Sequence, residues 1–313
     1  MPQTLPNPSA QVDDAIRIPA ASRRWDAPTP LRLWHLTSLD APTVAVVWSL
    51  AFAWAAKVSL PAWIPLLLVL AAWSAYIADR LLDARAALRT GNLQSLQSLR
   101  QRHWFHHRHR RLLGPLAIAA ACAAGCIVVG VMPSAARERD SVLAVAALAY
   151  FTRVHSSRRL PTAGLSSAGF SRLAPLFKKE LFVGLLFTAA CALPALSRAL
   201  AQTNAPNWPL SATALFFAMV AWLNCHAIER WETDDQAQRS GVFPLACLLT
   251  LAGLLLAYLT PDLQSRCAAL VLAGALSSLM LAFLDRLRNR FTPLALRISA
   301  DLVLLTPLAL LVR

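Results

Sequence analysis

The sequence predicts an all-α membrane protein, with nine transmembrane helices in a bundle around a central cavity. Hydrophobic residues make up 57% of the 313 residues, more than the roughly 45–50% that is usual in soluble domains. The mean hydropathy is +0.50. Apolar runs of about 18–20 residues, the length that crosses a hydrocarbon core, are separated by charged clusters. The amphipathic periodicity of a soluble protein is largely missing, which excludes a soluble fold.

Nine apolar segments are predicted to cross the membrane. They cover approximately residues 41–58, 61–78, 112–132, 141–152, 180–197, 209–228, 242–260, 267–284 and 293–312. The fourth is short, and the ninth contains Arg297 and Asp301, which are spaced to neutralise each other on one helix face. Residues 40–313 are therefore expected to form one membrane domain. Residues 1–39 are polar and contain prolines, so they are expected to be a disordered tail and not a signal peptide.

The charge distribution predicts the orientation. The net charge of +14 would indicate nucleic-acid binding in a soluble protein, but here Arg and Lys lie at the ends of apolar runs. With nine spans, 23 of the 30 Lys and Arg residues fall on one side of the membrane and 6 on the other. This asymmetry predicts a cytoplasmic N-terminus, a plasma or inner membrane location and contact with lipid, not nucleic acid. The six cysteines lie in or beside apolar runs and are expected to be buried free thiols.

The first candidate site follows the second predicted span. Asp79 and Asp83 are four residues apart, so on a helix both carboxylates face one direction. Two convergent carboxylates suit Mg²⁺, which takes one or two protein carboxylates and completes its shell with water and phosphate. The alternative is a helix-end ion network in which these carboxylates pair with Arg80 and Arg85.

The second candidate site follows the sixth predicted span. His226, Glu229, Glu232 and Asp235 recur at every third residue and form a slowly turning polar ridge, preceded by Asn224. Carboxylates at the ends of membrane spans are costly unless they are paired or bound to metal, so they are functional candidates. The alternative is a solvated helix end balanced by Arg230 and Arg239.

Two basic segments lie on the same predicted side. Residues 100–111 contain five arginines, including Arg102, whose forked guanidinium groups suit phosphate oxygens. The alternative is an anchor to anionic lipid. The histidines of this segment resemble one histidine box of the membrane di-iron desaturases, but those sites need several boxes. Lys178 and Lys179 enter the fifth span, where they could bind a pyrophosphate or act as topology markers.

This layout resembles the UbiA superfamily of intramembrane prenyltransferases, which have nine helices and acidic motifs after helices two and six. Asp79 and Asp83 match the last two Asp positions of the first family motif, while Ala75 and Tyr76 stand where its Asn and first Asp would be. Glu229-Arg230 is similar to the Asp-Arg of the second motif, and Glu232 or Asp234 stands for the Asp that follows. The segment from Pro175 through Lys178 and Lys179 to Gly184 resembles a third family motif.

The resemblance implies the transfer of a prenyl group from an isoprenoid diphosphate to an acceptor, with Mg²⁺ as cofactor. It implies catalytic and metal-binding roles for Asp79, Asp83, Glu229 and Glu232, with Asp235 as a further metal ligand. The diphosphate-binding residues that we expect are Arg80, Arg102, Lys178, Lys179, Asn224 and Arg230. The two acidic clusters are then expected to approach each other, within about 10 Å, across one cytoplasmic cavity mouth.

Two other functions remain open. One is a non-catalytic membrane protein of the same fold that binds an isoprenoid or a lipid. The other is a transporter, which is disfavoured because transporter sites lie near the midplane on broken helices. The sequence does not identify the acceptor.

The charge asymmetry yields a first testable prediction. Reporter fusions at Arg313 and within residues 198–208 are expected to report the extracytoplasmic side, because an odd number of spans separates each from the cytoplasmic N-terminus. A cytoplasmic signal at both positions would contradict the count of nine spans and the shared cytoplasmic face of the acidic motifs.

Overall fold

The computed structural model describes residues 25–90, 101–157, 174–203, 207–233, 241–260 and 266–312, apart from the side chains of residues 90, 153–157, 174–179 and 233. The regular elements of these residues are all helical. They are α2 (Thr29–Leu36), α3 (Asp40–Ala56), α4 (Trp63–Thr90), α6 (Gln101–Arg108), α7 (Arg110–Gly130), α8 (Ser134–Ser157), α9 (Ala174–Thr203), α10 (Trp208–Thr233), α11 (Val242–Leu259), α12 (Arg266–Leu287), the 3₁₀ turns η1 (Arg288–Arg290) and η2 (Val303–Leu305), α13 (Pro293–Leu302) and α14 (Leu308–Leu311).

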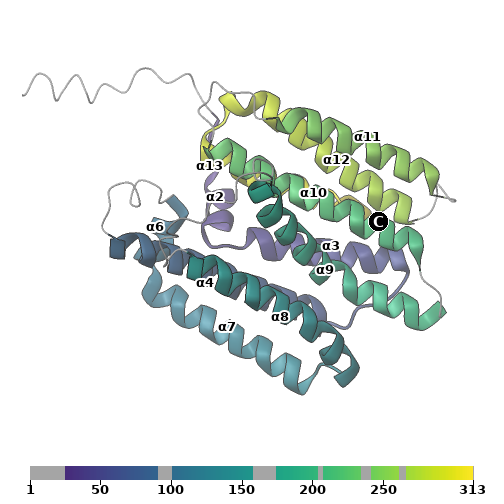
Figure 1. The fold of residues 1–313 in the computed structure, drawn as a ribbon, viewed down its shortest axis with the longest axis horizontal. Helices are drawn as coiled ribbons and strands as arrows, with labels where there is room; N and C mark the ends of the chain where they lie inside the picture. Colours follow the sequence, from purple (N-terminus) through teal and green to yellow (C-terminus); the bar gives the residue numbers. More distant parts are fainter. Residues whose placement is uncertain are drawn as a thin grey trace, which may run out of the picture.

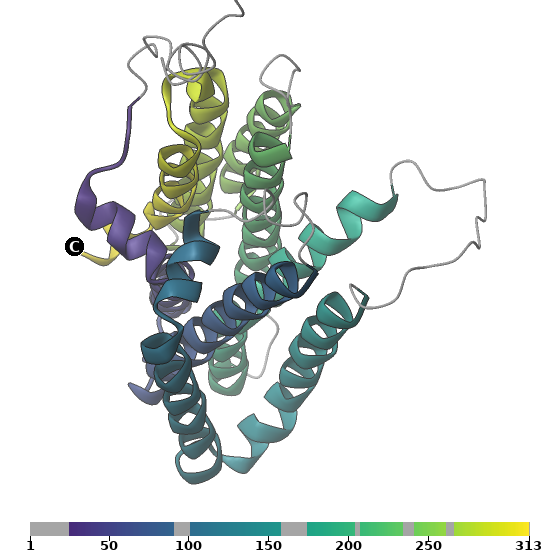
Figure 2. The same cartoon turned by 90° about the vertical axis from the view of Figure 1, so that its left-hand side faces the viewer.

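The long helices form three groups (Figure 1). Helices α10, α11 and α12 pack together on one side, α4, α7 and α8 lie on the other, and α3 and α9 lie between them. The short helices α2 and α6 touch each other at one end of the bundle. Figure 2 shows α7 and α8 diverging from the end where they are joined, with α4 beside α7.

Seven helices are long and apolar enough to cross a membrane, and the bent pair of α2 and α3 would make an eighth. The protein is therefore a multi-pass helical membrane protein, as the sequence predicts. The fourth predicted span lies in α8, which is not one of the seven; its first turns carry four charged residues between 137 and 140. The count of nine spans stays a prediction.

Aromatic rings fill the middle of the bundle. The Trp48 ring stacks on Phe217 with centroids 3.6 Å apart, and Phe52 packs at 5.9 Å from both rings. The Trp48 indole also donates a hydrogen bond to the carbonyl of Leu304 at 2.8 Å, which satisfies its polar edge. These contacts join α3, α10 and η2. The expected central cavity is not confirmed, since stacked rings lie at this point.

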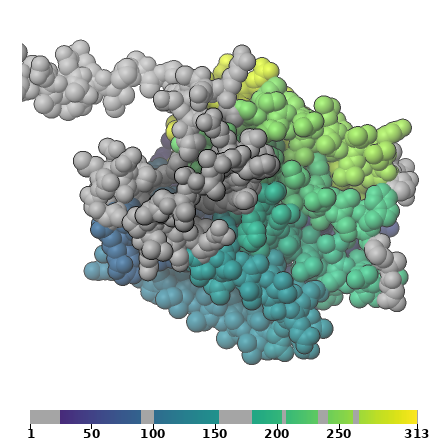
Figure 3. Space-filling model, in the orientation of Figure 1, coloured from purple at the N-terminus to yellow at the C-terminus, as the bar shows by residue number. Residues whose placement is uncertain are grey.

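The outermost helices carry exposed apolar side chains. On α7 and α8 these include Ile118, Val129 and Val142, and on α11 they include Leu248 and Tyr258, all more than 60% exposed. Figure 3 shows these helices along opposite edges of the molecule. Such extended apolar surfaces would be unfavourable in water, but they match a surrounding hydrocarbon phase.

The structure describes the chain from residue 25, whereas the sequence placed the start of the domain at residue 40. Trp25 pairs through its backbone with residues 290 and 292, and α2 follows with a proline in its first turn. Ala27 and His35 are buried. The expected tail therefore extends too far towards the C-terminus, because Leu31 and Trp34 pack against α13.

Helix α9 crosses α10 at Gly184. A Cβ atom on this glycine would lie 2.9 Å from the backbone nitrogen of Trp222 and 3.0 Å from the carbonyl oxygen of Ala218. Both neighbours are backbone atoms, so they cannot move aside as a side chain would. The close approach of the two helices therefore requires glycine here.

Gly184→Ala is expected to lower stability by about 1–3 kcal/mol through overpacking. The measurement is the unfolding midpoint of the detergent-solubilised protein. Gly125→Ala is the matched control, because no described atom lies within 4 Å of its Cβ position, and it should leave the midpoint unchanged or raise it slightly. Equal midpoints for both variants would contradict the close crossing.

Candidate functional site

A sharp break between α2 and α3 creates the centre of the candidate site. The two helices meet at 87°, and Ser38 at the break has a φ of 63°, a left-handed conformation that costs a non-glycine residue free energy. The break places His35 beside Asp40, with its Nδ1 only 2.6 Å from the Asp40 carboxylate. All three side chains are buried.

Arg80 of α4 holds this break together. Its Nη1 donates to the hydroxyl of Ser38 at 2.6 Å and to the carbonyl of His35 at 3.1 Å. Its Nη2 lies 3.7 Å from the Asp40 carboxylate. Arg80 is 2% exposed, and a buried guanidinium is tolerated only where a carboxylate and acceptors surround it. Here the Asp40 carboxylate, the Ser38 hydroxyl and the His35 carbonyl surround the Arg80 guanidinium.

Helix α6 is attached to the same break through His106. The ring Nδ1–H donates to the carbonyl of Arg102 at 2.8 Å, so Nε2 accepts from the Ser38 hydroxyl at 3.0 Å. Burial lowers the pKa of His106 to about 4. The imidazole is therefore neutral at neutral pH, which is the protonation state that this hydrogen-bond pattern needs.

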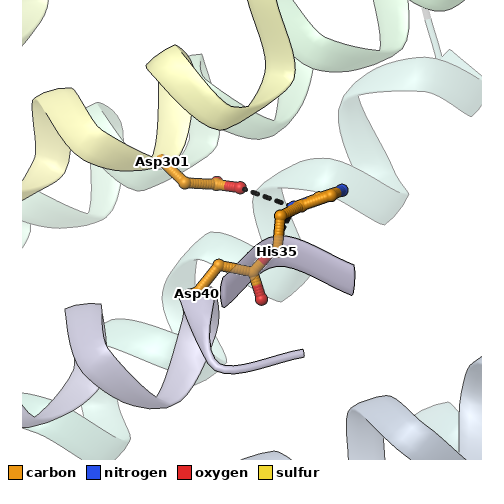
Figure 4. A group of neighbouring side chains, drawn as sticks. All are labelled: His35, Asp40 and Asp301. Atoms are coloured by element: carbon orange, nitrogen blue, oxygen red, sulfur yellow. Dashed lines mark hydrogen bonds and ion pairs between the residues drawn. The ribbon is translucent and has the colours of Figure 1, made fainter. Parts of the chain in front are cut away.

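Asp301 of α13 completes a cluster of three side chains (Figure 4). Its carboxylate lies 3.8 Å from Nδ1 of His35 and accepts a hydrogen bond of 3.4 Å from the amide of Asn224. The ligand atoms of His35, Asp40 and Asp301 all lie within 4.8 Å of one another. Helices α2, α3, α10 and α13 thus meet at one polar point.

A cavity of about 330 Å³ adjoins this cluster at the end of the bundle, between α2, α6, α10 and α13. This volume is at the lower end of the range for small-molecule sites. Three arginines, two carboxylates and one histidine contribute to its wall. The lining residues are Asp26, Arg32, His35, Gln101, Arg102, Glu232, Thr292, Pro293, Leu294 and Arg297.

Glu232 lies between two arginines in the cavity wall. One oxygen, Oε1, accepts from Arg297 at 2.9 Å and from Arg102 at 3.4 Å. The three groups come from α10, α13 and α6, and their side chains are 10–17% exposed. The sequence analysis paired Arg297 with Asp301 on one helix face, whereas the hydrogen bond of Arg297 joins it to α10.

The first predicted motif lies close to the same end of the bundle. Asp83 is half-buried, and its carboxylate lies 3.8 Å from Nε2 of His103 on α6. The preceding residue, Arg102, binds Glu232 of the second motif. Helix α6 therefore contacts both acidic motifs, although they are about 150 residues apart in the sequence. Asp79 is also half-buried on α4.

The other predicted residues lie in several different places. Glu229 is exposed, Asn224 is buried against Asp301, and Arg230 lines a smaller hollow of about 50 Å³ next to Glu232 and Arg297. The side chains of Lys178 and Lys179 and the whole of Asp235 lie outside the described residues, so their roles stay predictions. Glu180, the next residue along α9, forms a buried 2.9 Å contact with His226.

The four acidic motif residues do not form a preassembled metal site. Among the described residues, the only group of three metal-ligating side chains with converging atoms is His35, Asp40 and Asp301. Glu232 instead forms ion pairs with arginines, and Asp83 lies 3.8 Å from the His103 imidazole. Asp83 and Glu232 would give Mg²⁺ one carboxylate from each motif, so the phosphate oxygens of a bound substrate would have to supply further ligands.

The sequence analysis missed His35 and Asp40, which it placed in or beside a disordered tail, and it gave Asp301 no contact outside α13. One signal was present: Pro28 and Pro30 precede an apolar segment that ends in Trp34 and His35, which is typical of a helix start. Nothing local indicated that α2 would fold back on α13.

No protein-family model matches the chain, and no curated protein and no solved structure is significantly similar to it. The functional argument therefore rests on the geometry of the site.

The neutral state of His106 predicts a pH effect on stability. The lowered pKa of about 4, against about 6.5 in an unfolded chain, means that the unfolded state binds the proton first as pH falls. Stability should therefore be full above about pH 6.5 and decrease towards pH 4. His106→Gln should make the unfolding midpoint less dependent on pH in this window.

His109→Gln is the control, because His109 is exposed and only contacts its own helix region. The midpoint should be followed from pH 7.5 to pH 4.5 for all three proteins. Identical slopes for the native protein and His106→Gln would show that the His106 proton does not contribute.

Proposed function

We propose that the protein is a UbiA-like intramembrane prenyltransferase that transfers a prenyl group from an isoprenoid diphosphate to an acceptor. In this proposal the diphosphate binds in the arginine-lined cavity, whose wall contains Glu232 of the second motif, and Asp83 of the first motif is linked to that wall through α6. Nine spans with a cytoplasmic N-terminus would open this cavity to the cytoplasm. The apolar prenyl chain would lie among the membrane helices.

The observation that carries the proposal is the position of α6. Its adjacent residues Arg102 and His103 contact Glu232 and Asp83, which belong to the two acidic motifs. A diphosphate transferase needs acidic and basic groups from different helices around one ligand, because the leaving group develops charge as its C–O bond breaks. The cavity beside α6 brings such groups together.

Glu232 suggests how the diphosphate could be accepted. In the free protein it occupies donors of Arg102 and Arg297. Phosphate oxygens can replace a carboxylate in such pairs, since the guanidinium fork binds both. The exchange would leave both arginines paired and would release the Glu232 carboxylate.

Mg²⁺ bound with the diphosphate would supply charge neutralisation for the leaving group. Asp83 and the released Glu232, one carboxylate from each motif, are the residues that would hold it. The arginines neutralise the remaining negative charge. These groups lower the barrier by stabilising charge that grows in the transition state.

A second candidate is non-catalytic binding of an isoprenoid or lipid. It is favoured by one observation: Glu232 already pairs with two arginines and Asp83 lies 3.8 Å from His103, so both carboxylates have partners in the protein without a metal ion. The dependence of diphosphate binding on Mg²⁺ separates the two candidates, because only the enzyme should need the ion for tight binding.

Asp83→Ala is expected to lower Mg²⁺-dependent turnover by a factor of about 10²–10³, the usual effect of removing one group from a transition-state clamp. Stability should change by no more than about 1 kcal/mol, because Asp83 is not fully buried and its contact with His103 is long, at 3.8 Å. The measurement is diphosphate release from a labelled prenyl diphosphate in purified membranes.

Arg85→Ala is the matched control on the exposed face of the same helix turn. A simple helix-end ion network predicts similar effects on stability from both changes and no effect on diphosphate binding. Wild-type turnover in Asp83→Ala, or no Mg²⁺-dependent diphosphate binding in the native protein, would contradict the proposal.

A further inference from the structure

We propose that His35, oriented by Asp40, is the proton acceptor of this site and deprotonates a hydroxyl-bearing acceptor. This inference rests on the proposed transfer from a diphosphate and adds a residue that neither acidic motif contains. It also defines the acceptor chemistry as an alcohol, a phenol or water.

The geometry of His35 is that of an oriented base. Its Nδ1 lies 2.6 Å from the Asp40 carboxylate, and a carboxylate in this position accepts a hydrogen bond from Nδ1–H and fixes the tautomer. The remaining nitrogen, Nε2, is then the basic one. It is buried and has no hydrogen-bond partner among the described residues. A buried polar atom without a partner normally costs stability, so its presence here favours a functional role.

His35 also lies where a substrate would be. It contributes to the wall of the 330 Å³ cavity, together with Arg102 and Arg297. An acceptor attacking a diphosphate held by these arginines would lie beside His35, and the proposal requires it to reach the buried Nε2. In Figure 4 the far nitrogen of the His35 ring points away from Asp40 and Asp301.

A metal site at His35, Asp40 and Asp301 is the competing reading, and the neighbouring charges disfavour it. The Arg80 guanidinium lies 3.7 Å from Asp40, and Arg297 on α13 also acts on His35 and Asp301 electrostatically. With Glu232 included, the three arginines Arg80, Arg102 and Arg297 already face three carboxylates in this region. A divalent ion would add uncompensated positive charge to a buried cluster and would displace the short bond between His35 and Asp40.

The charged groups that face His35 come from three helices. Asp40 lies on α3, Arg80 on α4, and Asp301 and Arg297 on α13. Burial and the two arginines oppose the imidazolium that forms when His35 takes a proton, and the two carboxylates favour it. The protonation of His35 should therefore shape the pH dependence of turnover.

The reaction step balances with these groups alone. The acceptor oxygen forms a bond to C1 of the prenyl group, while the bond between C1 and the diphosphate oxygen breaks and its electron pair leaves with diphosphate. The proton of the acceptor hydroxyl passes to Nε2 of His35. Asp40 stabilises the resulting imidazolium and is a positioning residue.

The test uses His35→Gln and Asp40→Asn in the full-length protein, with radiolabelled farnesyl diphosphate as the probe. Binding is measured first, and diphosphate release is then followed with a panel of phenols and alcohols and with water alone. His35→Gln should bind the probe as the native protein does. Asp40→Asn also removes the carboxylate that faces the buried Arg80, so its unfolding midpoint is measured first and its kinetics are compared only if it folds. Each should lower kcat by about 10²–10⁴, as expected for loss of a general base, with little change in KM for the diphosphate.

The pH profile separates a base from a structural histidine. The native protein should lose kcat at acid pH as His35 becomes protonated, and His35→Gln should lack this acid limb. His109→Gln, which changes an exposed histidine outside the cavity, should keep native rates and the native profile.

Three results would overturn the inference. They are native kcat and pH profile in His35→Gln, loss of probe binding in both variants, and stoichiometric binding of Zn²⁺ or Mn²⁺ that His35→Gln abolishes. A native protein that neither binds nor turns over the diphosphate would instead contradict the proposed function. The two failures are therefore distinguishable.

Discussion

The burial of the Arg80 guanidinium is the constraint on which the rest of this structure depends. An arginine that is 2% exposed in an apolar bundle needs a carboxylate and hydrogen-bond acceptors around it, because an uncompensated buried charge would cost several kcal/mol. The chain supplies Asp40, the Ser38 hydroxyl and the His35 carbonyl. All three come from the break between α2 and α3, so the charge on α4 determines where that break must lie. The left-handed conformation of Ser38 is tolerated because these bonds hold it.

The same break positions the candidate site. His106 binds Ser38 and attaches α6, and α6 in turn reaches Asp83 and Glu232. Glu232 joins α10 to α13 through Arg297. A continuous set of charge pairs and hydrogen bonds thus runs from α4 through α2, α3 and α6 to α10 and α13. Among the described residues, three arginines and two carboxylates line the cavity, so an anionic ligand can pair with the arginines or exchange with Glu232. This property follows from the arrangement and holds for either candidate function.

Much of the fold follows from local sequence. Eight of the nine predicted spans coincide with helices that qualify by length and hydropathy, if the α2–α3 pair is included. Only the span in α8 does not, because four charged residues occupy its first turns. Hydropathy is a local property, and the cost of exposing backbone groups to lipid leaves a helix as the solution for each span. Both acidic motifs were found for a related reason: a carboxylate at the end of an apolar run is conspicuous. The sequence could not show that Arg80 faces inwards while Asp79 and Asp83 lie half-buried, since i and i+1 point in different directions around a helix.

The sequence by itself determined that this chain is a helical membrane protein, where most of its long helices lie, and that carboxylates and arginines gather at one end of them. The tertiary structure alone decided which of these charges meet. His35 and Asp40 lie on two helices joined by a sharp break, and Asp301 is more than 260 residues away, so no periodicity relates them. Helix packing likewise decided that Arg297 forms its hydrogen bond with Glu232 and not with Asp301. The physical reason is that the interaction of buried charges depends on distance in three dimensions and on exclusion of water, and helix packing sets both.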